Sequence, residues 1–277
     1  ASQVVAMDDP VAVALRQKKD SSMRVAINMV KEGRAQAAVS AGNTGALMAV
    51  SRFVLKTLPG VDRPAICTAI PTVSGHCHML DLGANVDSEP EHLLQFALMG
   101  QALVNAVDGV RHPRVALLNI GEEDIKGNEQ IKEAAGLLRD APNINYAGFI
   151  EGDGIFAGEA DVVVCDGFVG NILMKFAEGL GMAVVEYLKA RAPSGAEKMA
   201  GELLGELANL TNYVEHIGGG PLLGLNGVAI VGHGRSKAPS VTAAIGMACT
   251  ALERGLVELM SQELARVRLK VKDEQER

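Results

Sequence analysis

The chain has 277 residues, of which 48% are hydrophobic and 21% are charged, and this balance argues against a disordered protein. Its formal net charge of −7 gives no general attraction to nucleic acid or anionic lipid, so we expect no nucleic-acid partner. Aromatic residues make up 3% of the chain, which suits packed α/β layers better than a β-sandwich.

Helix and strand patterns alternate along the first half of the chain. We expect helices over residues 21–32, 43–57 and 90–107, and strands over residues 37–40, 65–70 and 78–81. The last two strands flank a turn at residues 72–75, which favours a hairpin.

The alternation continues in the second half. Strands are predicted over residues 115–119, 145–150, 162–165 and 228–231, and helices over residues 129–139, 171–191, 194–213 and 238–269. An unbroken apolar run at 162–165 is typical of a parallel strand covered on both faces. We therefore predict an α/β fold with a largely parallel open sheet and flanking helices. It forms a single two-lobed unit over 1–277, with a helical excursion near 192–220.

Cysteine spacing and the chain start bear on location. The four cysteines lie far apart without a C-x-x-C pair, which favours reduced thiols. The first residues lack a signal-peptide pattern, and no segment has roughly 18 uninterrupted apolar residues. We expect a cytoplasmic protein, with peripheral contact to the inner face of the cell membrane left open.

Three polar, glycine-rich corners follow predicted strands, at residues 37–45, 119–129 and 161–171. Open α/β sheets bind ligands beyond the carboxyl ends of their strands, so these corners suggest one composite active site. Lys126 lies in such a corner, where a lysine serves no packing purpose but suits an anion or a developing negative charge. Asn171 offers an uncharged N–H donor at a helix start, although an N-cap is the alternative.

Other candidates keep a structural alternative. Gly42, Asn43 and Thr44 predict either a nest for phosphate or an acyl oxyanion, or an ordinary capped helix. Asp81 and Asn85 end a strand and fit structural capping as well as substrate contact. His233 lies between two glycines just after a strand, and fits a base, a ligand contact or a turn histidine equally.

Two further patterns concern partners and metals. Arg16, Lys18 and Lys19 form the densest basic cluster, either a solvated helix face or a docking site for an acidic partner. His76 and His78 resemble a metal-binding pair, but no third ligand follows at zinc spacing. We therefore expect a turn with partly exposed imidazoles and no metal site. The chain lacks G-x-G-x-x-G, P-loop and G-x-S-x-G patterns, which disfavours nucleotide-binding and hydrolase classes.

Several stretches together resemble the PlsX family, the phosphate:acyl-(acyl carrier protein) acyltransferases of bacterial phospholipid synthesis. They are VVAMDDP at 4–10, LRQKKDSSM at 15–23, SAGNTGA at 40–46, DLGAN at 81–85, NIGEE at 119–123, KGNE at 126–129, residues 161–171 and residues 222–233. The resemblance implies transfer of a long-chain acyl group from acyl carrier protein to inorganic phosphate, without a cofactor. The acyl phosphate would then be used by a downstream glycerol-phosphate acyltransferase.

The resemblance also implies a structure and a site. The family fold is similar to phosphotransacetylases and isocitrate- or isopropylmalate-type dehydrogenases, and is homodimeric with a cleft between lobes. The lysine of K-G-N-E and the asparagine of D-G-F-x-G-N, which are catalytic by this resemblance, correspond to Lys126 and Asn171. Substrate-binding candidates are Gly42, Asn43, Thr44, Asp81, Asn85, Glu122, Asn128, Asp166, Gly170 and His233.

The chain departs from the family pattern in two places. The family opens with a D-A-M-G-G-D-like motif, which does not precede Val4, so we expect a truncated start or a lost βα segment. The excursion near 192–220 has an acidic polar face, which predicts weak liposome binding and favours dimer packing. The rival functions are a phosphotransacetylase that uses acyl-CoA, and a non-catalytic scaffold that binds acyl carrier protein or a partner enzyme.

Overall fold

The computed structural model describes residues 1–191 and 217–275, and within them eight strands form one sheet in the order β1-β8-β7-β2-β3-β6-β4-β5. The strands are β1 (Ala37–Ser40), β2 (Ala65–Thr72), β3 (Gly75–Leu80), β4 (Arg114–Leu118), β5 (Asn145–Ile150), β6 (Val162–Val164), β7 (Gly220–Leu223) and β8 (Val228–Val231). The described helices are α1 (Val11–Arg16), α2 (Ser22–Lys31), α3 (Thr44–Leu55), α4 (Pro90–Asp108), α5 (Glu129–Asp140), α6 (Gly152–Ala157), α7 (Gly167–Lys189), α10 (Ala238–Glu253) and α11 (Leu256–Gln275).

The sheet is parallel toward its edges and antiparallel at its centre. Parallel pairing joins β1 to β8 and runs through β3, β6, β4 and β5. The central strands β8, β7, β2 and β3 pair antiparallel. The predicted α/β class is thus confirmed, and β2 and β3 form the expected hairpin, with Thr72 opposite Gly75. Hairpins need only a short turn, whereas each parallel pair needs a crossover connection.

Two hydrophobic clusters cover the two faces of the sheet. Val162 and Val164 of β6 belong to one cluster, together with Phe96 of α4. Val163 points to the other face and joins the cluster that contains Leu47 of α3. All three valines are fully buried, which explains why this strand is an unbroken apolar run rather than an alternating one.

Several boundaries differ from the expectations. Helix α7 begins at Gly167, four residues before the predicted start, because the Asp166 side chain caps it by accepting from the Val169 N–H. The predicted helix over 238–269 is two helices, since Gly255 adopts a φ of +63° between them. Strand β7 and the short helices α1 and α6 were not predicted. Most of the proposed excursion, residues 192–216, lies outside the described residues, and β7 begins at Gly220.

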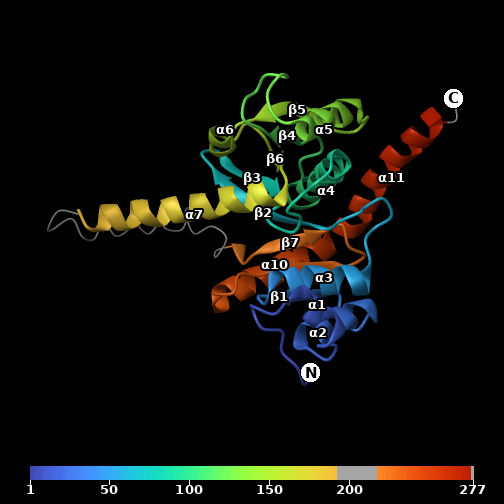
Figure 1. Ribbon diagram of the computed structural model, residues 1–277, viewed down its shortest axis with the longest axis vertical. Helices are drawn as coiled ribbons and strands as arrows, with labels where there is room; N and C mark the ends of the chain where they lie inside the picture. Colours follow the sequence, from blue (N-terminus) through green and yellow to red (C-terminus); the bar gives the residue numbers. More distant parts are fainter. Residues whose placement is uncertain (192–216, 276–277) are drawn as a thin grey trace.

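The arrangement in space places α7 between two groups of elements (Figure 1). Strands β1, β7 and β8 with α1–α3 lie on one side of it, and β3–β6 with α4–α6 lie on the other. From the centre of the sheet α7 then extends outward beyond the other elements (Figure 1). By length and composition alone α7 is apolar enough to cross a membrane, with 17% of its most apolar window buried. Its first half, however, supplies side chains to the cleft described next.

Candidate active site

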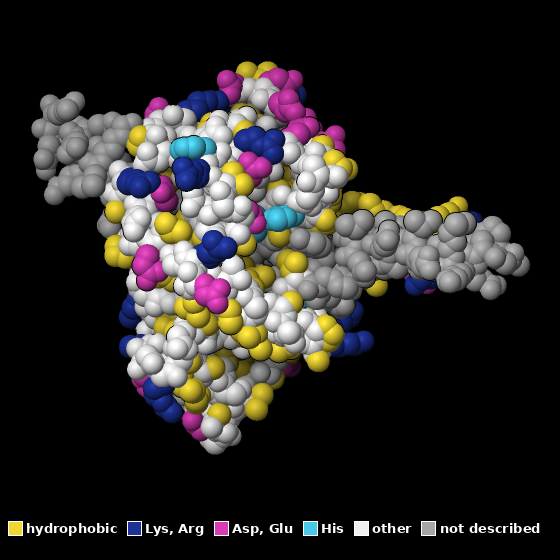
Figure 2. All heavy atoms as spheres, turned by 180° about the vertical axis from the view of Figure 1, so that it is seen from behind, with side chains coloured by type: hydrophobic (Ala, Val, Ile, Leu, Met, Phe, Trp, Pro, Cys, Tyr) yellow, Lys and Arg dark blue, Asp and Glu magenta, His cyan; other side chains and the backbone are white. Residues whose placement is uncertain are grey.

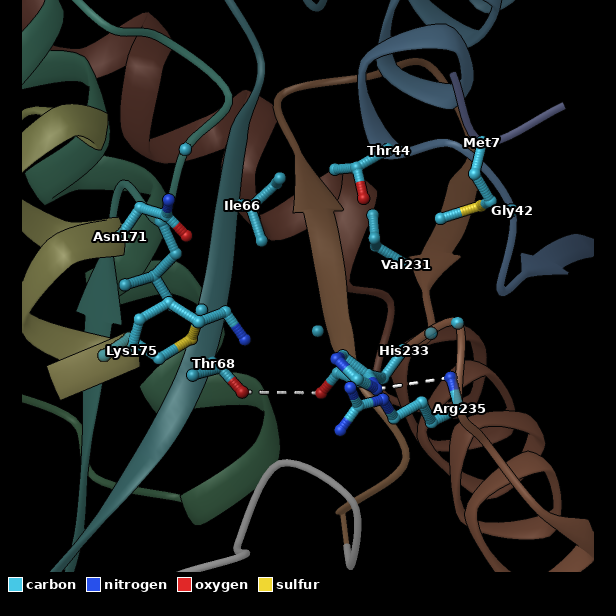
Figure 3. A pocket seen from close by; sticks show the side chains of 17 residues that line it. Met7, Gly42, Thr44, Ile66, Thr68, Asn171, Lys175, Val231, His233 and Arg235 are labelled. Atoms are coloured by element: carbon cyan, nitrogen blue, oxygen red, sulfur yellow. Dashed lines mark hydrogen bonds between the residues drawn. The ribbon is translucent and has the colours of Figure 1, made fainter. Parts of the chain in front are cut away.

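A cleft of about 590 Å³ opens where β2, β7 and β8 meet the first turns of α7 and the turn that follows β8. Its lining comes from separate stretches of the chain that the fold brings together (Figure 3). The lining residues are Met7, Gly42, Thr44, Ile66, Thr68, Leu82, Gly83, Asn171, Met174, Lys175, Gly219, Gly220, Val231, Gly232, His233, Gly234 and Arg235. Four of the predicted residues are therefore brought together here: Gly42, Thr44, Asn171 and His233.

The floor of the cleft is made of glycines because the backbone packs too closely for side chains. A Cβ on Gly220 would lie 1.9 Å from the Cys67 carbonyl oxygen. Gly219 has a φ of +135°, and a Cβ there would lie 2.0 Å from the Val231 oxygen. The Thr68 hydroxyl donates to the Gly219 oxygen over 3.4 Å, which ties β2 to this segment.

One wall of the cleft is α7, held against the end of β3 by two glycines. A Cβ on Gly170 would lie 2.0 Å from the Asp81 oxygen, and one on Gly167 would lie 2.5 Å from the Asn85 oxygen. This close packing aims the following turn at the cleft. Asn171 and Lys175 are four residues apart and so share one helix face. The Lys175 Nζ also lies 2.7 Å from the Glu178 carboxylate.

The opposite wall is the turn between β8 and α10. His233 Nδ1 accepts a hydrogen bond from the Arg235 N–H over 3.3 Å, so the proton of the neutral ring lies on Nε2. Arg235 is exposed and has no carboxylate partner among the ion pairs of the described residues. Figure 3 shows His233 and Arg235 across the floor from Asn171 and Lys175. Two cations from separate elements therefore face one cleft, which suits an anionic ligand.

The start of α3 completes the cleft with Gly42 and Thr44. Asn43 has a structural position instead, because its Oδ1 caps α3 by accepting from the Ala46 N–H over 2.9 Å. Its Nδ2 donates to the Met7 oxygen over 2.9 Å and so holds the N-terminal segment beside the cleft. Helix N-termini carry a partial positive charge, which adds to the attraction for an anion.

Asp81 and Asn85 lie beneath this site rather than in it. Asp81 is fully buried and accepts backbone N–H groups of Ile66 (3.0 Å), Leu82 (2.7 Å) and Asn85 (2.7 Å). Desolvation by burial is the largest effect on the carboxyl and raises its pKa, although the hydrogen bonds from Ile66 and Asn85 act in the opposite direction. Asn85 Nδ2 bridges Asp81 and the Pro64 oxygen, each at 2.8 Å. Both side chains organise the loop that supports Gly83 and α7.

Lys126 is exposed in the loop after β4, outside the residues that line the cleft. The loop is ordered by Asn119, whose Nδ2 donates to the Gly121 oxygen over 3.0 Å. Gly127 has a φ of +88° and approaches Asn119 so closely that a Cβ would lie 2.4 Å from its Oδ1. Asn171 thus lies in the cleft, and Lys126 lies outside its lining.

The other predicted binding residues are placed by local structure. Asp166 caps α7, and Asn128 caps α5 by accepting from the Ile131 N–H over 2.9 Å. Glu122 is exposed in the same loop as Lys126. In the basic cluster, Lys18 donates to Asp9 and to the Val4 oxygen, so it fastens the N-terminal segment. Arg16 and Lys19 belong to the same cluster and make no ion pair among the described residues.

A second, apolar groove of about 650 Å³ adjoins the cleft along α7. It lies between α7, the end of β2 and helix α6, and it shares Met174 with the first cleft. Its apolar lining includes Ile70, Val73, Phe156, Leu173, Phe176, Leu180 and Val184. A cleft that carries two cationic side chains therefore continues into a hydrophobic groove of similar size.

Three polar side chains of the cleft were not anticipated from the sequence: Thr68, Lys175 and Arg235. Lys175 follows Asn171 by four residues, so helical spacing would have found it. Arg235 follows His233 by two residues in a glycine turn, a weaker signal. No spacing connects Thr68 with either, because β2 meets β7 only through the fold of the sheet.

The cysteines are the free thiols expected from the sequence, whereas the histidines differ in part from expectation. All four cysteines are free thiols, and Cys165 beside Asp166 is buried. Desolvation raises the pKa of the Cys165 thiol well above its usual value, so it is a poor nucleophile. His76 and His78 lie on strand β3, not on a turn, and the His78 side chain is buried.

A family model described as fatty acid synthesis protein matches residues 1–259 of the chain. The chain is 67% identical over 268 residues to a phosphate acyltransferase of Alcanivorax borkumensis, covering 95% of this chain and 79% of that protein. It is 53% identical over 268 residues to a phosphate acyltransferase of Alkalilimnicola ehrlichii, covering 95% of this chain and 78% of that protein.

Solved structures share the fold at low sequence identity. EutD phosphotransacetylase from Staphylococcus aureus matches with a TM-score of 0.56 and 18% identity, covering 81% of this chain but 65% of that one. A branched-chain phosphotransacylase from Enterococcus faecalis matches with a TM-score of 0.52 and 15% identity, covering 90% and 82%. The predicted phosphotransacetylase-like fold is thereby confirmed. With a family model over most of its length and relatives above 50% identity, the chain belongs to the PlsX family of fatty acid synthesis proteins.

Proposed function

We propose that the chain transfers a long-chain fatty acyl group from acyl carrier protein to inorganic phosphate, giving an acyl phosphate. The observation that carries this proposal is the junction at Met174, where a cationic cleft meets an apolar groove. A phosphate needs the first and an acyl chain needs the second, and the reacting thioester lies where they join. The phosphate acyltransferase relatives support the same reaction.

The phosphate is assigned to the cleft between Lys175 and Arg235. An arginine guanidinium forms paired hydrogen bonds to phosphate oxygens, and a lysine adds a compact charge. His233 Nε2–H adds a neutral donor because Nδ1 is already an acceptor. Burying a dianion without such partners would be costly, so these residues determine whether phosphate binds at all.

Asn171 is assigned to the acyl carbonyl. A phosphate oxygen attacks the thioester carbon and forms a C–O bond, and the carbonyl oxygen becomes negative. The side-chain N–H of Asn171 stabilises that charge, as a donor in an oxyanion hole does. The C–S bond then breaks, and the thiolate of the carrier protein leaves and takes up a proton. No enzyme nucleophile is needed.

The acyl chain is assigned to the apolar groove along α7. Each buried methylene group contributes about 0.8 kcal/mol, so a groove lined by Phe156, Phe176 and Leu180 favours long chains over short ones. The same dependence of binding free energy on chain length favours a long-chain substrate over an acetyl group, which would leave the groove empty. The preference for chain length therefore depends on the apolar area that the acyl chain buries rather than on polar contacts.

Lys126 remains a proposed catalytic residue, supported by its K-G-N-E motif. Its exposed loop at the sheet edge would bring the charge to the thioester or to the phosphate when substrates are bound. Arg16 and Lys19 are the remaining cations of the N-terminal cluster and are proposed to meet the acidic carrier protein. Lys18 already donates hydrogen bonds to Val4 and Asp9, so it is not included in the proposed docking surface.

We propose a homodimer for the assembly, formed through the exposed apolar side chains of α7. Phe168, Ile172 and Met182 are more than half exposed, and Figure 2 shows hydrophobic side chains along the upper edge of the protruding arm. Contiguous apolar surface of this kind marks an interaction site. The cytoplasmic location, peripheral membrane contact and supply of a downstream glycerol-phosphate acyltransferase are part of the same proposal.

The decisive experiment measures acyl phosphate formation from palmitoyl-(acyl carrier protein) and phosphate. Lys175→Met and Arg235→Met are expected to raise the KM for phosphate about ten- to a hundredfold, the loss typical of a charged hydrogen bond. The KM for the acyl carrier protein substrate should change little. Lys132→Met, which removes a cation of α5 that lines neither the cleft nor the groove, is the matched control and should leave both constants unchanged.

Two outcomes would contradict the proposal. A preference for short acyl-CoA would indicate a phosphotransacetylase, and a folded protein without turnover would indicate a binding scaffold. Asn171→Ala and Lys126→Ala test the catalytic assignment separately. Each is expected to lower kcat about a hundredfold or more while leaving the thermal unfolding midpoint unchanged. Near-normal kcat in either variant removes that residue from the mechanism.

A further inference from the structure

A cluster of two histidines and one carboxylate lies away from the proposed active site. His76 and His78 are on β3, and Asp108 is the last residue of α4, which packs beside that strand (Figure 1). The cleft is formed at the opposite end of β3, beyond Leu80. None of the three residues lines the cleft or the apolar groove.

The backbone determines that these side chains meet. Residues two apart on a strand point to the same face, so His76 and His78 both face α4, whereas Cys77 packs in the cluster on the other face. The His76 Nε2 lies 3.2 Å from Oδ1 of Asp108, and the His78 Nε2 lies 2.9 Å from Oδ2. The two rings meet edge to face with centroids 5.1 Å apart.

We propose that His76, His78 and Asp108 form a binding site for a divalent transition-metal ion of the zinc class. One ligand atom from each residue lies within 4.8 Å of the other two. In a tetrahedral zinc site the ligand atoms are about 3.4 Å apart, so small side-chain rotations bring them to that geometry. Imidazole nitrogen and carboxylate oxygen are both ligands that this class of ion accepts.

Burial at the site is uneven, and this suits a site that exchanges its ion with solvent. The His78 side chain is 9% exposed and is held by the strand, whereas the His76 side chain is 36% exposed. His76 gives the ion access, and His78 with Asp108 gives a fixed pair of ligands. Three protein ligands leave a fourth position for water. Bound metal would join β3 to the end of α4 and stabilise that junction.

Metal uptake by the full chain tests the proposal. Protein freed of metal with a chelator, in a Cys249→Ser background that removes the exposed thiol, is titrated with Zn²⁺ against a chromophoric chelator. We expect one equivalent of Zn²⁺ per chain, and visible absorption bands when Co²⁺ replaces it. Zn²⁺ should also raise the thermal unfolding midpoint.

The variants separate a metal site from a hydrogen-bonded cluster. His76→Ala removes an exposed ligand without disturbing the core, and Asp108→Asn keeps the shape but removes the charge. Both variants should lose the saturable binding of one equivalent of Zn²⁺ and the Co²⁺ absorption bands. His112→Ala, which changes an exposed histidine elsewhere, should keep both. Absence of saturable uptake in the parent protein, or unchanged uptake in both ligand variants, would overturn the proposal.

Discussion

Arg114 and Asp161 clamp the start of β4 to the segment before β6. The Arg114 Nη2 donates to Oδ1 of Asp161 over 2.8 Å, and the Arg114 backbone N–H donates to Oδ2 over 2.7 Å. Partial desolvation raises the pKa of Asp161, but the hydrogen bonds and charge of Arg114 outweigh it, and the net pKa is lowered. A carboxyl group whose folded pKa is lowered stabilises the fold above its unfolded pKa, and this contribution is lost as pH falls through the folded value.

Asp161→Asn is therefore expected to lower the free energy of unfolding by about 1 kcal/mol at pH 7, since the pair is partly exposed. The difference from the parent protein should shrink below the ordinary aspartate pKa of 3.8 and vanish once Asp161 is protonated in the fold. Urea unfolding at a series of pH values from neutral to acid measures it. Arg114→Met should lose the same pH-dependent part of the free energy of unfolding. A deficit that persists undiminished in acid would show that the charge is not responsible.

At the scale of an element, α7 combines a tightly packed start with an exposed continuation. Gly170 lies against the Asp81 backbone, whereas a Cβ added to Gly179, nine residues later on the same helix, would meet no neighbouring atom within 4 Å. The first half is fixed by β3 and aims Asn171 and Lys175 at the cleft. The apolar side chains of α7 from Leu173 to Val184 form one side of the apolar groove. One helix thus connects the two proposed subsites.

Alanine substitution at these two glycines gives opposite expected results. Gly170→Ala should destabilise the protein by about 3 kcal/mol or more and reduce turnover, because the added methyl group forces α7 away from Asp81. Gly179→Ala should be neutral or stabilise by up to about 1 kcal/mol, since alanine favours a helix. Chemical denaturation compares the two variants. Equal stabilities would mean that the start of α7 is not held as closely as the geometry indicates.

At the scale of the whole molecule, the exposed apolar side of α7 predicts self-association. Analytical ultracentrifugation should give about twice the 29.0 kDa mass of the chain at micromolar concentration. Met182→Lys places a charge on this surface, where the parent side chain is 58% exposed, and should shift the protein toward monomer. Val110→Lys, at an exposed position after α4, is the control and should leave the mass unchanged. A monomeric parent protein would contradict the proposed dimer.

Patterns in the sequence alone predict the α/β class, the β2–β3 hairpin and the phosphate acyltransferase family. These rest on local features, namely hydrophobic periodicity, turn residues and motif order along the chain. The sequence also predicts a role for Gly42, Thr44, Asn171 and His233, which the fold brings to one cleft, because polar residues after strands predict the ligand-binding edge of such a sheet. It missed β7, whose short glycine- and proline-containing segment becomes a strand only by pairing with β2 and β8.

Which side chains meet depends on how the helices and strands pack together. Lys175 and Arg235 face one cleft because β2 and β7 are neighbours in a sheet whose order does not follow the chain. Asp108 lies beside His76 and His78 because α4 ends next to β3. Asp108 is 30 residues beyond His78 in the chain. Asn43, Asp81 and Asp166 turned out to hold backbone N–H groups. Sequence spacing reports only neighbours along one helix or strand, whereas contacts between elements depend on how hydrophobic faces pack together, and that is a property of the folded chain.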